Sequence, residues 1–268
     1  MTSTTAVPAT EAGVTRAVTE DGIATLTLAR PARYNTLTSA VIAELSAHLA
    51  AIAADPAVRV VILASTGKAF STGHDLKEMN AARNEAFYRQ LFADCSRMMQ
   101  SIVALPQPVI AQVQGIATAA GCQLVATCDL AVAAASARFA TNGIQNGLYC
   151  ATPSVALSRV VQRKHALEML LTGDFIDAAR AAEMGLVNHV VPDAELETAT
   201  RALAGRIADK SQFAIRLGKA SFYRQVNQGL DSAYRGTSED LVCNLLAEDG
   251  QEGLDAFIAK RPPVWRDR

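Results

Sequence analysis

The sequence predicts an α/β domain followed by a region that contains only helices. Short runs of β-branched and apolar residues alternate with amphipathic segments up to residue 191, and this alternation is typical of an α/β fold. After Pro192 the apolar spacing is helical throughout. We therefore expect a disordered tail at residues 1–13, a core domain at 14–204 and a helical subdomain at 205–268.

The core domain begins with a predicted β-hairpin. Apolar runs at residues 14–18 and 23–28 flank Glu-Asp-Gly, in which Gly22 can adopt the positive φ of a tight turn. A helix at residues 40–54 follows, because its apolar residues recur at three- and four-residue spacing. The β-branched run at residues 58–64 then predicts a strand that is buried on both faces.

The same alternation continues along the chain and defines the remaining elements. In the core domain we expect helices at 87–103 and 121–127, strands at 109–113 and 129–133, a helical segment from 166 to 171 and a strand at 187–191. The predicted C-terminal helices lie at 194–209, 211–226, 230–247 and 251–260.

Composition excludes several classes of protein. The chain has 268 residues, of which 50% are hydrophobic, so it can bury a large core. No apolar run approaches the roughly 18 uncharged residues of a transmembrane helix, so we expect no membrane partner. The net charge is −1 and the basic residues are scattered, which argues against nucleic-acid binding.

The cysteines and the first residues predict a reducing location. The five cysteines, which lack CxxC spacing and neighbouring histidines, are Cys95, Cys122, Cys128, Cys150 and Cys243. This pattern predicts free thiols and no metal site. Residues 1–13 have neither the charged and apolar regions of a signal peptide nor the arginines of a transit peptide. We therefore expect a cytoplasmic protein.

Two glycine-containing segments are the strongest functional signal. Lys-Ala-Phe-Ser-Thr-Gly-His-Asp-Leu-Lys-Glu-Met at residues 68–79 and Gly-Ile-Ala-Thr-Ala-Ala-Gly-Cys-Gln-Leu at residues 115–124 each follow a predicted strand. Glycine and alanine let the backbone approach a ligand closely. Two backbone N–H groups aimed at one point would form an oxyanion hole.

These segments resemble the crotonase (enoyl-CoA hydratase/isomerase) superfamily, and the resemblance covers residues 14–265. It is closest to the branch called enoyl-CoA hydratase domain-containing protein 3, which has Gly-His-Asp-Leu-Lys and a C-terminal Pro-Val-Trp, here ending at Trp265. The resemblance implies a crotonase (ClpP-like) α/β fold of repeated ββα units, with a helical C-terminal trimerisation region. It also implies an enzyme of the lyase class.

By resemblance, the backbone N–H groups of His74 and Ala120 hold the thioester oxygen of an acyl-CoA. Residues 74–77, which are His74, Asp75, Leu76 and Lys77, would meet CoA together with Ala120. CoA belongs to the substrate, so no separate cofactor is implied. A homotrimer, or a hexamer of two trimers, is expected.

By the same resemblance, Gln123 and Gly143 stand at the two positions where the family's hydratases have glutamates. A carboxylate can exchange protons with a substrate, whereas an amide cannot titrate and glycine has no side chain. We therefore expect weak hydratase activity. The His74 imidazole is the most obvious titrating substitute, but a side chain on this loop can equally point elsewhere.

Rival functions remain open at this point. The chain can be a non-catalytic acyl-CoA-binding protein, or a CoA thioester hydrolase or isomerase that uses a different base. A dinucleotide-binding dehydrogenase is also α/β, but it requires GxGxxG after the first strand, and the sequence has none.

Overall fold

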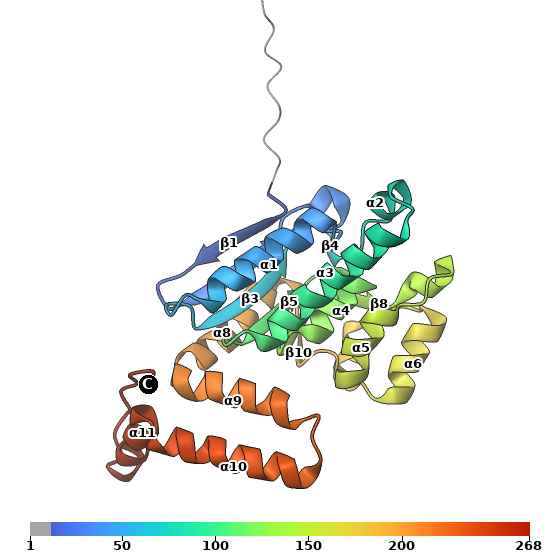
Figure 1. The fold of residues 1–268 in the computed structure, drawn as a ribbon. Helices are drawn as coiled ribbons and strands as arrows, with labels where there is room; N and C mark the ends of the chain where they lie inside the picture. The colour runs from blue at the N-terminus through green and yellow to red at the C-terminus, as the bar shows by residue number, and fades with distance from the viewer. Residues whose placement is uncertain (1–11) are drawn as a thin grey trace, which may run out of the picture.

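Two β-sheets organise residues 12–268, the part of the chain that this computed structural model describes (Figure 1). The larger sheet has the strand order β1-β2-β3-β5-β7-β10. β1 is antiparallel to β2, and all the other pairs are parallel. Its strands are β1 (Val14–Val18), β2 (Ile23–Leu28), β3 (Val60–Ser65), β5 (Val109–Val113), β7 (Leu130–Ala134) and β10 (His189–Val191).

The smaller sheet, with the order β4-β6-β8-β9, is built from short strands that follow those of the larger sheet. Its strands are β4 (Ala69–Ser71), β6 (Ile116–Thr118), β8 (Arg138–Ala140) and β9 (Ile176–Asp177). Tight turns at Gly67 and Gly115, both with positive φ, carry the chain from β3 to β4 and from β5 to β6. The pairs β3–β4, β5–β6 and β7–β8 thus each give one strand to each sheet, in keeping with the expected repeated ββα units.

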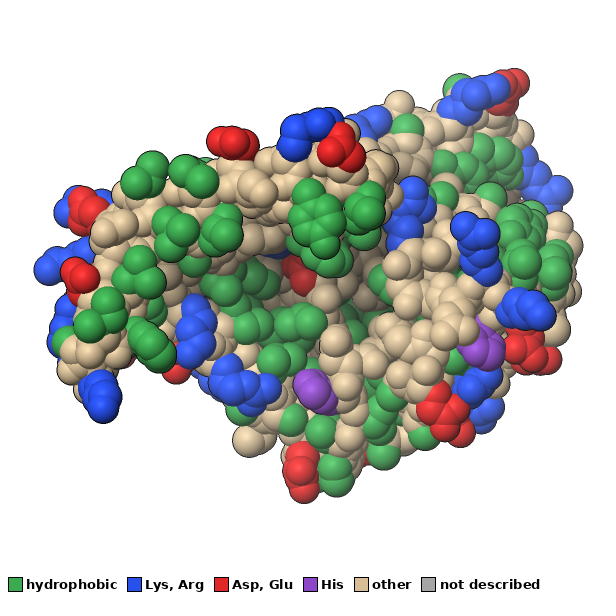
Figure 2. Space-filling view, turned by 90° about the horizontal axis from the view of Figure 1, so that it is seen from below, with side chains coloured by type: hydrophobic (Ala, Val, Ile, Leu, Met, Phe, Trp, Pro, Cys, Tyr) green, Lys and Arg blue, Asp and Glu red, His purple; other side chains and the backbone are tan. Residues whose placement is uncertain are grey.

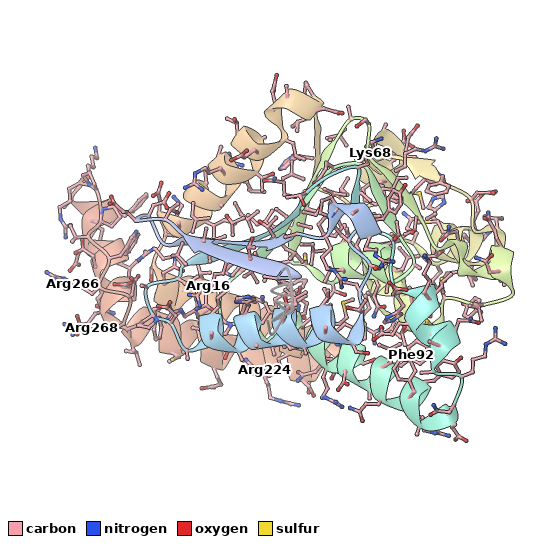
Figure 3. All side chains as sticks on the ribbon, turned by 90° about the horizontal axis from the view of Figure 1, so that it is seen from above. Arg16, Lys68, Phe92, Arg224, Arg266 and Arg268 are labelled. Carbon is pink, nitrogen blue, oxygen red and sulfur yellow. The ribbon has the colours of Figure 1, made fainter. Side chains whose placement is uncertain are left out.

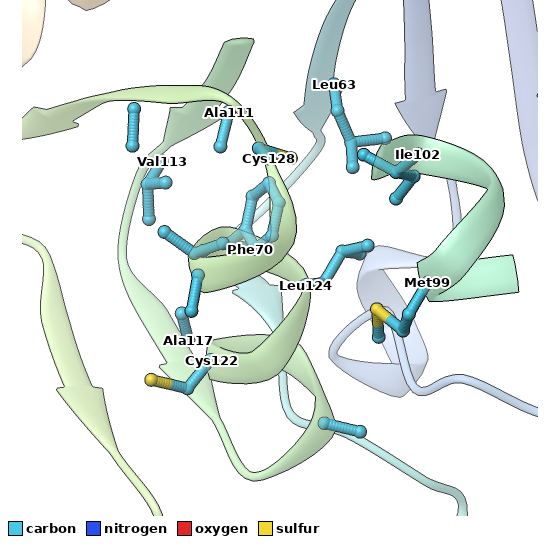
Figure 4. Close-up of a cluster of buried hydrophobic side chains, with 14 of the residues drawn as sticks. Leu63, Phe70, Met99, Ile102, Ala111, Val113, Ala117, Cys122, Leu124 and Cys128 are labelled. Atoms are coloured by element: carbon cyan, nitrogen blue, oxygen red, sulfur yellow. The ribbon is translucent and has the colours of Figure 1, made fainter. Parts of the chain in front are cut away.

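Helices cover both faces of the larger sheet, and β3 shows how the sequence specifies this. Val61 and Leu63 pack into the main core with α1, α3 and α4 (Figure 4), whereas Val60 and Ile62 pack against α8 on the other face. Successive side chains of a strand point to opposite faces, so a strand covered on both sides has no polar position.

The helical elements of the core fall between the strands. They are η1 (Pro31–Arg33), α1 (Ser39–Ala53), α2 (Leu76–Ala81), α3 (Glu85–Ala104), α4 (Ala120–Thr127), η2 (Asn142–Asn146), α5 (Ala151–Val160), α6 (Arg163–Thr172), α7 (Ala178–Glu183), η3 (Asp193–Glu195) and α8 (Leu196–Ala208). Several begin with a side-chain cap, as where Asn84 accepts a hydrogen bond from the N–H of Phe87 at the start of α3.

The last three helices, α9 (Gln212–Gln225), α10 (Leu230–Leu246) and α11 (Glu248–Ile258), form a layer beside the core (Figure 1). The chain then folds back on this layer. The buried carboxylate of Asp249 accepts hydrogen bonds from the N–H groups of Arg266 and Asp267, and the Trp265 indole donates to the carbonyl of Asp209.

A half-buried carboxylate ties this helical layer to the core. Asp129, between α4 and β7, accepts hydrogen bonds from Lys219 Nζ at 2.7 Å and from the Tyr223 hydroxyl at 2.8 Å, both on α9. It also accepts one from the N–H of Val109 at 2.7 Å. Lys219 donates further to the carbonyls of Ile102 and Gln107. The ammonium charge is therefore fully compensated although the side chain is buried.

The long elements and several short ones, among them α4, β7 and β10, agree with the sequence predictions. The hairpin and the strand at residues 109–113 match closely, whereas β4, β6, β8 and α5 were not predicted. The predicted domain boundary between residues 204 and 205 lies within α8. The division into two domains stays a prediction. The predicted tail lies almost entirely outside the described residues. No helix within residues 12–268 has the length and apolarity required to cross a membrane.

We predict that Lys219→Met lowers the free energy of unfolding by about 3 kcal/mol, because it leaves the half-buried Asp129 carboxylate without its partner charge. Arg89→Met is the matched control, since it removes an ion pair with Glu85 whose side chains are both 77% exposed, and should change stability by at most about 0.5 kcal/mol. Chemical denaturation measures both. Equal midpoints for the two variants would contradict a coupling role for Asp129.

Candidate active site

Two loops meet at one edge of the smaller sheet. β4 and β6 are parallel neighbours, so the segments that follow them leave the sheet side by side. The first segment contains Gly73 and His74, and the second contains Ala119 and Ala120. The two glycine-containing segments of the sequence are therefore brought together, as the oxyanion-hole interpretation requires.

Glycines allow these loops to touch backbone to backbone. Gly73 has φ +82, and a Cβ added there would lie 2.9 Å from the backbone N of Ala120. A Cβ added at Gly121 would lie 2.1 Å from the carbonyl oxygen of Ser71. Any side chain at either position would push the loops apart, so glycine is required at both.

Ala119 turns the chain into α4 through a strained conformation. Its φ of 49 and ψ of −119 are unfavourable for a residue with a Cβ. Its N–H donates to the carbonyl of Ala140 at 3.0 Å, which helps to hold the turn against β8. This turn leads directly into Ala120, the first residue of α4, whose backbone N lies against Gly73.

The backbone N–H groups of His74 and Ala120 donate no hydrogen bond to any acceptor within residues 12–268. The N–H groups of the first turn of a helix have no partner inside the helix, and they carry a partial positive charge. Both residues line a cavity of about 900 Å³. The arrangement can therefore bind an oxygen atom that carries negative charge.

The cavity is lined by α2, α3, η2 and the start of α5 as well as by the two loops. Phe92 on α3 contributes an aromatic wall (Figure 3). Other lining residues, which include backbone and apolar side chains, are Tyr34, Thr36, Met79, Ile116, Thr118, Asn142, Asn146, Leu148, Tyr149, Pro153 and Phe175. Most of these were not predicted, because they come from six separate segments that only the fold brings together.

The His74 imidazole is held at the wall of the cavity. Its Nδ1 lies 3.4 Å from the carbonyl oxygen of Leu37, and its ring packs edge to face on Phe92 with centroids 5.4 Å apart. Burial lowers the pKa of His74 below its usual 6.5, although the Leu37 hydrogen bond and the Glu78 carboxylate act in the opposite direction. The ring is therefore neutral at pH 7.

Asp75, Leu76 and Lys77 also line the cavity. Asp75 caps α2 by accepting hydrogen bonds from the N–H groups of Lys77 and Glu78, and it accepts another from the Thr36 hydroxyl. Burial by itself would raise the pKa of Asp75, but these hydrogen bonds hold it below its usual value. The carboxylate is ionised and engaged in local structure.

Gln123 and Gly143, the two positions at which the resemblance predicts the family's glutamates, differ in their surroundings. Gly143 lines the cavity, whereas Gln123 does not: it is 5% exposed on α4, and its Oε1 is buried without a protein partner. A Cβ added at Gly143 would lie 2.5 Å from the carbonyl oxygen of Leu148 and 2.9 Å from Cys150 Sγ. A side chain at position 143 would therefore clash with its neighbours, although the backbone φ of Gly143 is one that other residues can adopt.

The remaining charged and cysteine side chains near the site differ in whether they line the cavity. Two cationic side chains, Arg33 and Lys77, line the cavity, whereas Lys68 at the start of the first glycine-containing segment does not. Cys150 lines the cavity, and burial raises the pKa of its thiol. Within residues 12–268, no cluster of three His, Cys, Asp or Glu residues could hold a metal ion. The absence of a cofactor stays a prediction.

Sequence and structure comparisons decide the family. The model described as enoyl-CoA hydratase/isomerase matches residues 18–268. The chain belongs to this family. A rat relative, enoyl-CoA hydratase domain-containing protein 3, mitochondrial, is 45% identical over 258 residues, which cover 96% of this chain and 86% of the rat protein.

Solved structures confirm the crotonase fold. An enoyl-CoA hydratase from Mycobacterium smegmatis superposes on this family member with a TM-score of 0.94 at 49% identity, covering 95% of this chain and 99% of the other. Human enoyl Coenzyme A hydratase domain-containing protein 3 gives a TM-score of 0.92 at 46% identity, with coverage of 94% and 100%. The family and the branch predicted from the sequence are therefore both confirmed.

The same comparisons correct the predicted cytoplasmic location. The matching rat, frog, mouse and human proteins all carry the word mitochondrial in their names, which contradicts that prediction. The error has a physical origin. Free cysteines indicate a reducing compartment, but they do not identify which one.

We predict that Gly121→Ala destabilises the fold by about 3 kcal/mol, because the new methyl group overlaps the Ser71 carbonyl. Gly218→Ala is the control: it is an exposed position of α9 with no neighbouring atom within 4 Å, and alanine should stabilise the helix there by about 0.5–1 kcal/mol. Thermal unfolding measures both. If the two variants have the same unfolding temperature, the contact between the loops is not tight.

Proposed function

We propose that this protein is an enzyme that binds acyl-CoA thioesters and stabilises a thioester enolate. The backbone N–H groups of His74 and Ala120 would donate to the thioester oxygen. The observation that carries the proposal is the glycine-mediated contact that brings these two partnerless N–H groups together in one cavity. Membership of the enoyl-CoA hydratase/isomerase family supports the same substrate class.

Two properties of the site favour charge stabilisation. Ala120 is the first residue of α4, so the helix dipole adds to its N–H, and α4 is buried along its whole length. Removing one donor from an oxyanion hole typically raises the barrier by about 3–4 kcal/mol. The cavity volume, about 900 Å³, is within the usual range for small-molecule sites and suits an acyl chain with part of CoA.

CoA would meet the loop at residues 74–77 and the backbone at Ala120. The exposed side chains of Leu76 and Lys77 lie at the rim of the cavity, where an adenine ring and phosphates could contact them. Arg33, which also lines the cavity, adds a second positive charge. Recognition would therefore depend mainly on backbone groups and a cationic rim.

Hydration is disfavoured as the main reaction. Among the described residues that line the cavity, Asp75 carries the only carboxyl group, and it is engaged as a helix cap. Activation of water and protonation of the α-carbon each gain roughly 10²–10⁴ in rate from a suitable acid or base. Isomerisation or hydrolysis with another base, or binding without turnover, are the alternatives.

To test the oxyanion assignment, the affinity for butyryl-CoA is measured by calorimetry in His74→Ala and His74→Pro. His74→Ala keeps the N–H and should keep most of the affinity. Proline has no N–H, so His74→Pro should bind about tenfold more weakly, as expected for one lost hydrogen bond. Circular dichroism checks that both variants fold. Equal affinities in two folded variants would remove the oxyanion hole from the proposal.

A second experiment concerns hydration. We expect wild-type turnover of crotonyl-CoA below about 1 per second, at the bottom of the usual range for enzymes. Gly143→Glu should not restore it, because the new side chain overlaps the Leu148 carbonyl, and should lower the unfolding temperature. Turnover of hundreds per second by the wild type would show that hydration does not require the two carboxylates.

We further propose that the protein assembles as a homotrimer, or as a hexamer of two trimers, through its C-terminal helices. Hydrophobic side chains gather over this layer on the face seen in Figure 2. The large apolar residues that α9–α11 leave exposed are Phe222, Val226, Leu230, Tyr234, Leu241, Val242, Leu245, Leu246, Leu254, Phe257 and Ile258. An apolar area of this kind is typical of a contact surface.

Light scattering at micromolar concentration should give three or six times the mass of the chain. Phe257→Glu places a charge on a side chain that is 84% exposed in the single chain, and should shift the mass toward the monomer. Val18→Glu, on the edge strand β1, is the control and should leave the mass unchanged. A wild-type monomer would refute the assembly.

A further inference from the structure

A third segment of the chain lies against the loop that contains Gly73. The N–H of Thr72 donates to the carbonyl of Tyr34 at 3.2 Å, and the N–H of Leu37 donates to the carbonyl of Gly73 at 2.8 Å. Leu37 and His74 also pair as an isolated parallel bridge. The segment before α1 therefore runs alongside this loop and is hydrogen-bonded to its backbone.

The hydrogen bond from Leu37 sets the direction of one proposed oxyanion donor. The carbonyl of Gly73 and the N–H of His74 belong to one peptide group, which is trans, as are all others within residues 12–268. In a planar trans peptide group the C=O and the N–H point in opposite directions. Because Leu37 holds the C=O, the N–H is directed away from Leu37. The same hydrogen bond polarises the peptide group, which makes its N–H a better donor.

Asn35 holds this segment in place. Its side chain is 2% exposed, and its hydrogen bonds go to backbone groups. Oδ1 accepts one from the N–H of Arg30 at 2.9 Å, while Nδ2 donates to the carbonyls of Thr66 and Ala69, both at 2.8 Å. Thr66 follows β3 and Ala69 begins β4, the strand that leads into the loop. One side chain thus joins the segment to the strand before the loop.

The backbone explains why asparagine suits this position. Tyr34 and Asn35 have φ of 51 and 52, in the left-handed region that asparagine tolerates better than most residues. The three contacts also require a side chain with both an acceptor and a donor, which an amide has. Aspartate would offer acceptors only, and glycine would keep the backbone conformation without any of the contacts.

We propose, building on the acyl-CoA function above, that Asn35 is a positioning residue for recognition of the thioester oxygen. It fixes the segment in which Leu37 holds the carbonyl of Gly73, and the N–H of His74 is thereby aimed at the bound oxygen. Asn35 does not line the cavity, so it acts through the backbone and not by contact with the substrate. Without its hydrogen bonds the peptide group between Gly73 and His74 would be free to turn.

The test separates recognition of the carbonyl from the rest of CoA binding. Butyryl-CoA has a thioester oxygen and its thioether analogue S-butyl-CoA has none, so the ratio of their dissociation constants reports on the oxyanion donors. Asn35→Asp keeps the contact with Arg30 and removes the two donated hydrogen bonds. Asn35→Gly removes all three without adding a charge, and glycine accepts the φ of 52. Calorimetry measures both ligands with each variant.

Gln107 supplies the matched controls. Its side chain is 1% exposed, and its Nε2 donates to the carbonyls of Ile52 and Asp55 at 3.0 and 3.4 Å. It precedes β5 and does not line the cavity. Gln107→Glu and Gln107→Gly therefore remove a similar pair of buried hydrogen bonds away from the site, and they reproduce the loss of stability without the loss of position.

We expect the wild type to bind butyryl-CoA at least about tenfold more tightly than S-butyl-CoA. In both Asn35 variants this ratio should fall below about threefold, while the affinity for S-butyl-CoA stays within about threefold of the wild type. The Gln107 variants should keep the wild-type ratio although they unfold at a lower temperature.

Infrared difference spectra of butyryl-CoA labelled at the carbonyl carbon give an independent measurement. Hydrogen bonds to the oxygen weaken the C=O bond, so the stretching frequency should fall when the ligand binds to the wild type. It should fall less in the Asn35 variants and as much as in the wild type in the Gln107 variants. A role of Asn35 in stability alone would leave this frequency unchanged.

Several outcomes would overturn the proposal. A wild-type ratio in both Asn35 variants removes the positioning role and leaves the acyl-CoA function intact. Equal loss of affinity for both ligands shows that Asn35 shapes the cavity and not one peptide group. If neither Asn35 variant folds while the Gln107 variants do, Asn35 supports the whole fold instead. A wild type that binds both ligands equally has no oxyanion hole, and one that binds neither refutes the underlying function.

Discussion

Direct contact between the backbones of two loops is the constraint on which the candidate site depends. Gly73 lies against the N–H of Ala120, and Gly121 lies against the carbonyl of Ser71. No side chain separates the loops, so their relative position is set by van der Waals contact and not by flexible groups. The strained turn at Ala119 persists because β8 and α4 hold it on both sides. An oxyanion hole requires this kind of pre-organisation.

The same construction links the C-terminal layer to the site. Asp129 follows α4 closely, and α4 begins at Ala120, so the carboxylate that binds Lys219 and Tyr223 is connected to the proposed oxyanion hole through one short buried helix.

The sequence predicted the elements that pattern alone can specify. The buried strand at residues 58–64 and the long helices follow from hydrophobic periodicity, and the two loops follow from glycine and alanine placed after strands. β4, β6 and β8 have three residues each, too short for any periodicity to appear. The cavity wall was also missed, since Phe92 and Phe175 are distant in sequence. The surroundings of the His74 ring depend on Leu37, which only the fold brings into contact.

The packing around Gly143 limits which substitutions this part of the site can accept. The carbonyl of Leu148 and the thiol of Cys150 fill the volume that a side chain at this position would occupy. A single nucleotide change could place a carboxylate here, but the segment at residues 147–150 would first have to move. At this position, therefore, the packing of the fold rather than the genetic code limits which side chain can enter the cavity.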